Sequence, residues 1–168
     1  GALRRLGLSH NGVGGPRLPA LPRAGALLGV PALDLALNEL THAGLQAILA
    51  RPPAADRVEE LHLGGNQLDD AGAAVLAHCP HLARLTALSL RSCHIADERA
   101  RVLANSPHLN RVQVLDLSSN PIGDTGFRSL HDSKHWASLQ RLVFSPLGLS
   151  HDMRKALDQK FNRPPRRA

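Results

Sequence analysis

Aromatic side chains are nearly missing from this sequence, which has one Trp, three Phe and no Tyr among its 168 residues. A protein that stacks nucleic-acid bases on rows of aromatic rings is therefore not expected. No apolar run approaches the ~18 residues of a membrane-spanning helix, so the sequence predicts no membrane segment. Two cysteines and no Asn-x-Ser/Thr site favour a cytoplasmic protein over a disulfide-stapled secreted domain. Because the chain starts at Gly1 without a Met, a cleaved leader and secretion as an effector stay open.

The excess of positive charge, +6 in total, lies at the two ends of the chain. Residues 1–30 hold four arginines and no acid, and residues 154–168 hold six basic residues against Asp158. The stretch 31–153 between them sums to −3. Basic ends attract polyanions weakly and without sequence preference. The charge therefore predicts no specific nucleic-acid partner.

One sequence pattern, by contrast, occurs six times along the chain. The copies start at Leu3, Val30, Val58, Leu85, Val112 and Leu139, and they read LRRLGLSHNGV, VPALDLALNEL, VEELHLGGNQL, LTALSLRSCHI, VQVLDLSSNPI and LQRLVFSPLGL. Their starts are 27 or 28 residues apart, and the first five fit L-x-x-L-x-L-x-x-N/C-x-L, with Val or Ile in place of some of the leucines. In the sixth copy Leu147 replaces the Asn and Phe144 replaces the second strand Leu. A constant period of this length predicts a solenoid in which each repeat buries its apolar face against its neighbours.

This pattern resembles the leucine-rich repeat family over residues 3–157, and the repeat length is similar to that of the ribonuclease-inhibitor-like class. The resemblance implies an α/β fold: a right-handed solenoid forming a short horseshoe arc, with six parallel strands on the concave face and helices on the convex face. It also implies protein binding through the concave face, often within a larger regulatory or effector protein. The segment Gly72–Ala77 is similar to repeats of bacterial effectors that target plants.

The residues of each copy lead to the same architecture by physical argument. Leucine pairs such as Leu61 and Leu63 alternate with polar residues, as in a strand buried on one face. The Asn that follows turns the chain, and its amide can bond the backbone of a neighbouring repeat. Strands pack ~4.8 Å apart and helices about 8–10 Å apart, so the stack must curve. The expected strands are centred near Leu6, Leu33, Leu61, Leu88, Leu115 and Leu142.

Acidic residues mark the expected starts of three helices. Asp70, Asp97 and Asp124 occupy one column of the repeat, where a carboxylate can cap the free N–H groups of the first turn. Pro80 and Pro107 follow the helical stretches, where they stop a helix from continuing. The expected order within each repeat is therefore strand, turn, helix and return.

The ends of the chain depart from the pattern, as the ends of solenoids do. Pro19 and Pro22 forbid a regular helix in the first repeat, so an irregular or one-turn segment is expected there. A last helix is expected from about Asp152 to Lys160. We predict one repeat domain over residues 1–158 and a basic, disordered tail over residues 159–168. The start on a full repeat without a cap predicts further sequence upstream.

Alternation along the strands predicts three exposed columns on the concave face. The first is Arg5, Ala32, Glu60, Ala87, Val114 and Arg141; the second is Gly7, Asp34, His62, Ser89, Asp116 and Val143; the third is Ser9, Ala36, Gly64, Arg91, Ser118 and Ser145. Among these, the candidate partner-binding residues are Arg5, Asp34, Glu60, His62, Ser89, Arg91, Asp116 and Arg141.

The middle column places Asp34, His62 and Ser89 side by side, in the acid–base–nucleophile order of a hydrolytic triad. An open curved sheet, however, supplies no enclosed pocket, no oxyanion donors and no barrier to water. The favoured interpretation is therefore a hydrogen-bonded surface ladder, and no catalytic residue is predicted.

Two pairs of adjacent cysteine and histidine residues have the composition of a four-ligand zinc site. They are His78 with Cys79 and Cys93 with His94. The repeat places Cys79 at the end of a helix and Cys93 in the Asn column beyond the next strand. A strand of about seven residues at ~3.3 Å each separates the pairs by roughly 20 Å. That distance is too long for a shared zinc ion or a disulfide, and Cys93 is interpreted as a replacement for Asn.

A second histidine column, His81, His108 and His135, lies on the return from helix to strand. The spacing of the repeats is wider there than in the sheet, so shared metal coordination is not expected. Trp136 follows His135 and occupies the column of Leu82 and Leu109. We therefore predict that Trp136 packs in the core and is not a binding hot spot. No metal and no cofactor are predicted.

The function that these observations favour is a monomeric, non-enzymatic module that binds a protein partner through its concave face. The columns offer Arg5, Arg91 and Arg141 but no aromatic, although hot spots favour Trp, Tyr and Arg. Two alternatives stay open at this point. One is a structural spacer within a longer solenoid, and the other is weak polyanion binding through the basic termini.

Overall fold

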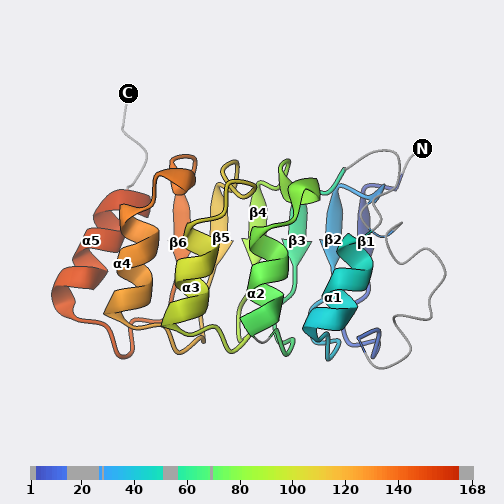
Figure 1. Cartoon of the computed structure of the whole chain (residues 1–168), viewed down its shortest axis with the longest axis horizontal. Coiled ribbons are helices and arrows are strands. Elements are labelled where there is room, and N and C mark those ends of the chain that lie inside the picture. The colour runs from blue at the N-terminus through green and yellow to red at the C-terminus, as the bar shows by residue number, and fades with distance from the viewer. Residues whose placement is uncertain (1–2, 15–26, 28, 51–56, 69, 163–168) are drawn as a thin grey trace.

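The computed structural model describes residues 3–14, 27, 29–50, 57–68 and 70–162. Strands and helices alternate along the chain (Figure 1). The strands are β1 (Arg5–Gly7), β2 (Ala32–Asp34), β3 (Glu60–His62), β4 (Ala87–Ser89), β5 (Val114–Asp116) and β6 (Arg141–Val143). The helices are α1 (His42–Leu49), α2 (Asp70–Ala77), α3 (Asp97–Ala104), α4 (Asp124–Asp132) and α5 (His151–Phe161), with short 3₁₀ turns η3 (Pro80–Leu82) and η4 (Lys134–Trp136).

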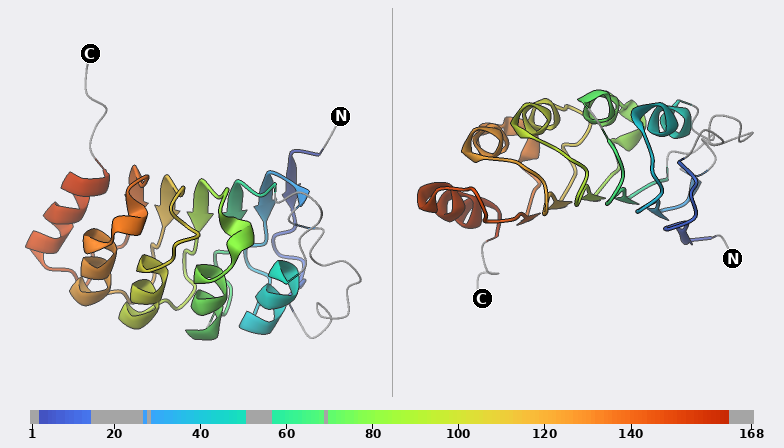
Figure 2. Two further views of the ribbon diagram at one scale, coloured as in Figure 1. Left: turned by 45° about the horizontal axis from the view of Figure 1, so that its top comes forward. Right: turned by 90° about the horizontal axis from the view of Figure 1, so that it is seen from below.

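The six strands form one parallel sheet in sequence order, and each is centred on the leucine that the repeat predicted. The register is constant, so that Leu61 pairs with Leu33 on one side and with Leu88 on the other. The sheet lines the inner side of a short arc and the helices line the outer side (Figure 2). Successive helices pack against one another along that outer side. The α/β solenoid with a concave sheet is confirmed.

The core lies between the sheet and the helices. The two strand leucines of each central repeat point inward and are almost completely buried, as Leu61 at 1% and Leu63 at 0% exposure illustrate. Helix residues such as Leu76 and Leu103 close over them from the convex side. Each repeat thus buries apolar surface only against its neighbours, and the repeats share one continuous core.

A ladder of asparagine side chains crosses the core at the turns after β2, β3 and β5. Asn66 is 1% exposed and its Oδ1 accepts hydrogen bonds from the N–H groups of Asn38 (3.0 Å) and Leu40 (2.9 Å). Its Nδ2 donates to the carbonyls of Leu35 (2.9 Å) and Leu63 (2.7 Å). Asn38 and Asn120 bond neighbouring repeats in the same way. The predicted asparagine ladder is confirmed.

Cys93 occupies the next rung and makes fewer bonds than an asparagine. Its Sγ donates to the carbonyl of Leu63 at 3.2 Å. Burial raises the pKa of the Cys93 thiol to about 11, although the N–H groups of Asn66 and Gly65 face the sulfur and partly offset this effect. Among the described residues, no group accepts a hydrogen bond from the N–H of Leu68, whereas the equivalent N–H of Leu40 is bonded to Asn66 Oδ1.

Replacing Cys93 by Asn is therefore expected to raise the free energy of unfolding by about 1 kcal/mol, the usual gain from one buried hydrogen bond. The new Oδ1 would accept from the N–H of Leu68, as Asn66 Oδ1 accepts from Leu40. Urea unfolding of the parent, Cys93→Asn and Cys93→Ala measures the effect. A Cys93→Asn protein less stable than Cys93→Ala would show that this turn cannot accept the asparagine rung.

The column of acidic residues at the helix starts acts differently from the prediction. Asp97 is the first residue of α3, but its Oδ1 accepts from the N–H of Gly123 (2.6 Å), which precedes α4 in the next repeat. Asp124 likewise accepts from the N–H of Ser150 (2.9 Å), and this hydrogen bonding lowers the pKa of the Asp124 carboxyl. The expectation that Asp97 and Asp124 cap their own helices was wrong, because each bonds the N–H of the residue that precedes the following helix instead.

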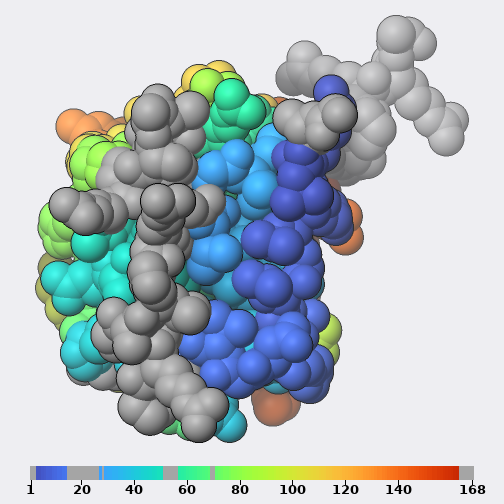
Figure 3. Space-filling view, turned by 90° about the vertical axis from the view of Figure 1, so that its right-hand side faces the viewer, coloured from blue at the N-terminus to red at the C-terminus, as the bar shows by residue number. Residues whose placement is uncertain are grey.

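A side chain forms hydrogen bonds with the outer edge of β6, the last strand of the sheet. Asn162, just after α5, accepts from the N–H of Leu142 and donates to its carbonyl, both at 2.9 Å. One amide therefore satisfies the outward backbone groups of the central β6 residue, which blunts an edge that would otherwise pair with another strand. At the opposite end of the arc β1 lies at the surface (Figure 3).

The terminal segments differ in part from the expectation. Helix α5 continues to Phe161, which is buried at 2% exposure, so residues 159–161 belong to the helix and not to the tail predicted from 159. Ser150 caps this helix by accepting from the N–H of Met153 (3.2 Å). The remaining tail, residues 163–168, and most of the irregular segment expected after Asn11 lie outside the described residues.

Candidate interaction surface on the concave face

The concave face is formed by the strand side chains that point away from the core. The register aligns Asp34 with His62, His62 with Ser89, and Ser89 with Asp116, as the middle column required. These side chains are partly exposed, and Arg5, Arg91 and Arg141 are fully exposed. The structure therefore brings the predicted residues onto one face of one sheet.

One ion pair crosses the N-terminal part of this face. Arg5 Nη2 and Glu60 Oε2 are 2.9 Å apart, although the two residues are 55 positions apart in sequence. Their side chains are 69% and 41% exposed. Exposed pairs of this kind contribute about 0–1 kcal/mol to stability. Arg5 and Glu60 are therefore available to exchange this contact for one with a partner.

A hollow of about 430 Å³ opens in the middle of the face. Ala36 and Gly64 leave space there because they carry little or no side chain, and Arg91 lies across from them. Leu37 forms an apolar wall that is 48% exposed. The complete lining is Asp34, Ala36, Leu37, His62, Gly64, Gly65, Ser89, Arg91 and Ser92.

Leu37 holds an unusual backbone conformation beside this hollow. Its φ is +55°, in the left-handed region that a leucine rarely adopts. A Cβ at Gly65 would lie 2.3 Å from Leu37 Cδ2, and Gly65 itself has a φ of +69°. Glycine is thus required at position 65 for two reasons: its backbone has a positive φ, and a Cβ there would collide with Leu37. The absence of that Cβ leaves room for the Leu37 side chain beside the turn.

The hydrolytic arrangement of Asp34, His62 and Ser89 does not form. Asp34 Oδ1 instead accepts a hydrogen bond from the N–H of Ala36 at 2.9 Å, two residues further along the same chain segment. No hydrogen bond joins the three side chains to one another in the described part of the chain. The expected hydrogen-bonded surface ladder is therefore not observed either, and these groups face solvent separately.

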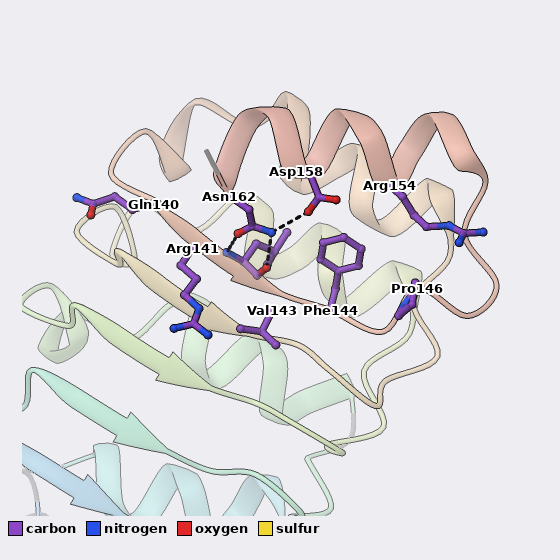
Figure 4. Close-up of a pocket in the computed structure, with 9 residues that line it drawn as sticks. Gln140, Arg141, Val143, Phe144, Pro146, Arg154, Asp158 and Asn162 are labelled. Atoms are coloured by element: carbon purple, nitrogen blue, oxygen red, sulfur yellow. Dashed lines mark hydrogen bonds between the residues drawn. The ribbon is translucent and has the colours of Figure 1, made fainter. Parts of the chain in front are cut away.

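Asp116 and Arg141 lie toward the C-terminal end of the face. Asp116 Oδ1 accepts from the N–H (2.9 Å) and the hydroxyl (2.6 Å) of Ser118. Arg141 borders a second hollow of about 580 Å³ between β6 and α5, together with Phe144 and Arg154 (Figure 4). Asn162 and Asp158 form the back of that hollow and are hydrogen bonded to each other at 3.0 Å.

Sequence reasoning missed the apolar parts of this surface. The alternation along the strands places Val114, which is 39% exposed, in the first column without a role, and it gives no position to Leu37. The sequence signal for the central hollow was the presence of small residues at Ala36, Gly64 and Gly65. These three positions of neighbouring repeats carry no large side chain.

The cysteines and histidines lie where the repeat placed them. Cys79 and Cys93 are both buried, and neither forms a disulfide. Among the described residues, no three His, Cys, Asp or Glu side chains are grouped so as to hold a metal ion. Trp136 is 2% exposed, which confirms its assignment to the core. Within the same described ranges, no helix is long and apolar enough to cross a membrane.

Comparison with known proteins agrees with the geometry. The family model described as "Leucine Rich repeat" matches residues 32–49, 58–77, 78–104 and 108–130, which together make up just over half of the chain. The segments 32–49, 58–77 and 108–130 begin at or shortly before a strand. The segment 78–104 begins after α2 and includes β4 and α3 of the next repeat. No curated protein matches the chain.

Proposed function

The chain belongs to the leucine-rich repeat family, and we propose that it is a protein-binding module whose concave sheet face docks a segment of its partner. Members of the family generally mediate protein–protein interaction. The observation that carries the proposal is the central hollow, whose lining includes the half-exposed Leu37 and the exposed Arg91. Arginine is one of the residue types that binding hot spots favour, and Leu37 offers apolar surface that a partner can remove from water.

Rigidity of the face supports the same proposal. The strands are fixed by a constant register, and the turns after them are fixed by the asparagine ladder. A partner that binds such a preformed surface does not have to order it, which lowers the entropic cost of association. The face is also open and shallow, and a segment of protein can cover it more completely than a small molecule can.

The alternative role, a structural spacer within a longer solenoid, has less support than partner binding, because of the contacts at the outer edge of β6. Another strand paired to β6 would have to displace Asn162 from both backbone groups of Leu142. We propose an intracellular site of action, because both cysteines are thiols outside any disulfide and a reducing compartment preserves thiols.

Replacing Arg91 by Glu is expected to weaken partner binding at least tenfold while leaving the fold intact. Arg91 is exposed on the rim of the hollow, so reversing its charge removes an anchor without disturbing the core. A partner captured from cells with the immobilised chain would be purified, and its Kd measured for the parent and the variant. Arg128→Glu, a matched charge reversal on the convex helix α4, should leave the Kd unchanged. Equal losses for the two variants would show that the concave face is not the docking surface.

A further inference from the structure

Three arginines stand at one position of three consecutive repeats, just before β3, β4 and β5. They are Arg57, Arg84 and Arg111, each three residues ahead of its strand, and all three are exposed. Arg84 and Arg111 lie in identical turns, since Leu85 N–H bonds Leu82 O (2.9 Å) and Val112 N–H bonds Leu109 O (3.1 Å). These residues, here called the arginine row, belong to the edge of the solenoid where the strands begin (Figure 1).

The backbone keeps the arginine row in register. Thr86 N–H donates to Glu59 O (2.8 Å), and Gln113 N–H donates to Thr86 O (2.7 Å), so the pairing of the strands extends toward the arginines. Neighbouring strands are ~4.8 Å apart. The three guanidinium groups therefore project from points roughly 5 Å apart along a row about 10 Å long.

Most of the charge of this row is not neutralised within the protein. Arg84 Nη2 lies 3.4 Å from Glu59 Oε1, with side chains 59% and 48% exposed, which makes a weak, solvent-screened pair. Within the described residues, neither Arg57 nor Arg111 makes a hydrogen bond or ion pair through its side chain. Like charges on neighbouring strands destabilise a sheet, so the row is unfavourable for the isolated domain.

We propose that the arginine row binds an acidic segment of a protein partner, at a surface separate from the concave hollow. A guanidinium forms paired N–H···O bonds with a carboxylate, and this fork geometry is stronger than a simple charge contact. In an extended peptide, alternate side chains lie on one face about 6.6 Å apart. Two or three alternate Glu or Asp residues therefore match the spacing that flexible arginine side chains can reach.

The dimensions favour an acidic peptide over a nucleic acid. A row about 10 Å long offers contacts to only a few phosphates, whereas nucleic-acid modules bury about 600–1,000 Å² or more. Stable single-strand binding also uses aromatic platforms for the bases. The chain has four aromatic residues, and Trp136, Phe127 and Phe161 are buried. The row therefore lacks the second component that nucleic-acid recognition requires.

The test uses a short synthetic peptide of alternating glutamate and serine as the probe, with the intact chain and low ionic strength. The variant carries Arg57→Ser, Arg84→Ser and Arg111→Ser, because Ser138 already occupies this column in the next repeat. We expect the parent to bind the peptide, and the triple variant to bind at least tenfold more weakly. Its urea midpoint should be unchanged or higher, because the repulsion along the row is relieved.

Two controls decide what the binding means. A second triple variant, Arg101→Ser, Arg128→Ser and Lys155→Ser, removes the same charge from exposed helix positions and should bind like the parent. Equal weakening in both variants would show attraction to net charge alone and would overturn the site. A single-stranded oligonucleotide of matched charge should bind more weakly than the peptide. If it binds more tightly through the same three arginines, the row is a phosphate-binding surface and the acidic-peptide assignment is wrong.

Discussion

Replacing Trp136 by Ala is expected to lower the free energy of unfolding by about 3–5 kcal/mol, the range for deleting a large buried aromatic side chain. Trp136 is the largest side chain in the core and is 2% exposed. It ends η4, where its carbonyl accepts from Leu139 N–H (3.1 Å) as the return enters β6. A cavity there loosens the return and the strand together. Urea unfolding followed by circular dichroism measures the loss.

Trp136→Leu is the matched control, because leucine holds this column at Leu82 and Leu109. We expect it to cost less than half as much as alanine. The indole Nε1 is buried without a hydrogen-bond partner, so its removal also relieves an unfavourable group. If leucine proves as damaging as alanine, the tryptophan has a specific role that core packing does not explain.

The fold could be predicted from the sequence because the same physical constraint recurs six times. A leucine pair such as Leu61 and Leu63 must be buried, and Asn66 must then satisfy the backbone of the turn. A constant spacing repeats both requirements in register. The leucine pattern therefore predicted the central residue of each strand correctly. The buried asparagine ladder could be predicted because buried backbone groups must be hydrogen bonded.

Contacts that depend on the relative placement of neighbouring repeats could not be predicted in the same way. Asp97 looks like a helix cap in sequence, but the N–H of Gly123 lies within its reach, and local pattern carries no information about that distance. Asn162 lies beyond the last repeat, so no column anticipated its bonds to Leu142. Both residues act between segments that only the folded stack brings together.

The candidate site was only partly predictable, for a related reason. Alternation correctly placed Asp34, His62 and Arg91 on the concave face, since side-chain direction follows from position in the strand. The shape of the face depends on backbone dihedrals in the turns. His10, Leu37, Ser92 and Ser119 all have positive φ without being glycine, so composition did not reveal these turns or the exposed wall at Leu37.

Replacing Asn66 by Ala is expected to lower the free energy of unfolding by at least about 3 kcal/mol, because each orphaned buried group costs roughly 1–3 kcal/mol. Three backbone groups lose their partner, namely the N–H groups of Asn38 and Leu40 and the carbonyl of Leu35. The carbonyl of Leu63 keeps only the weaker bond from the Cys93 thiol. No water replaces them, since this turn is buried between two repeats. The loss should affect the whole domain, because each repeat depends on its neighbours for burial.

His62→Ala is the control for Asn66→Ala, because His62 lies only four residues away, at the end of β3, and lines the concave hollow. The His62 ring makes no hydrogen bond within the described residues and faces the concave hollow. Its removal should change stability by no more than about 0.5 kcal/mol, as for ordinary surface positions. Thermal and urea unfolding of both variants beside the parent give the comparison. A larger loss for His62→Ala than for Asn66→Ala would invert the assignment of buried and concave columns, and with it the proposed docking face.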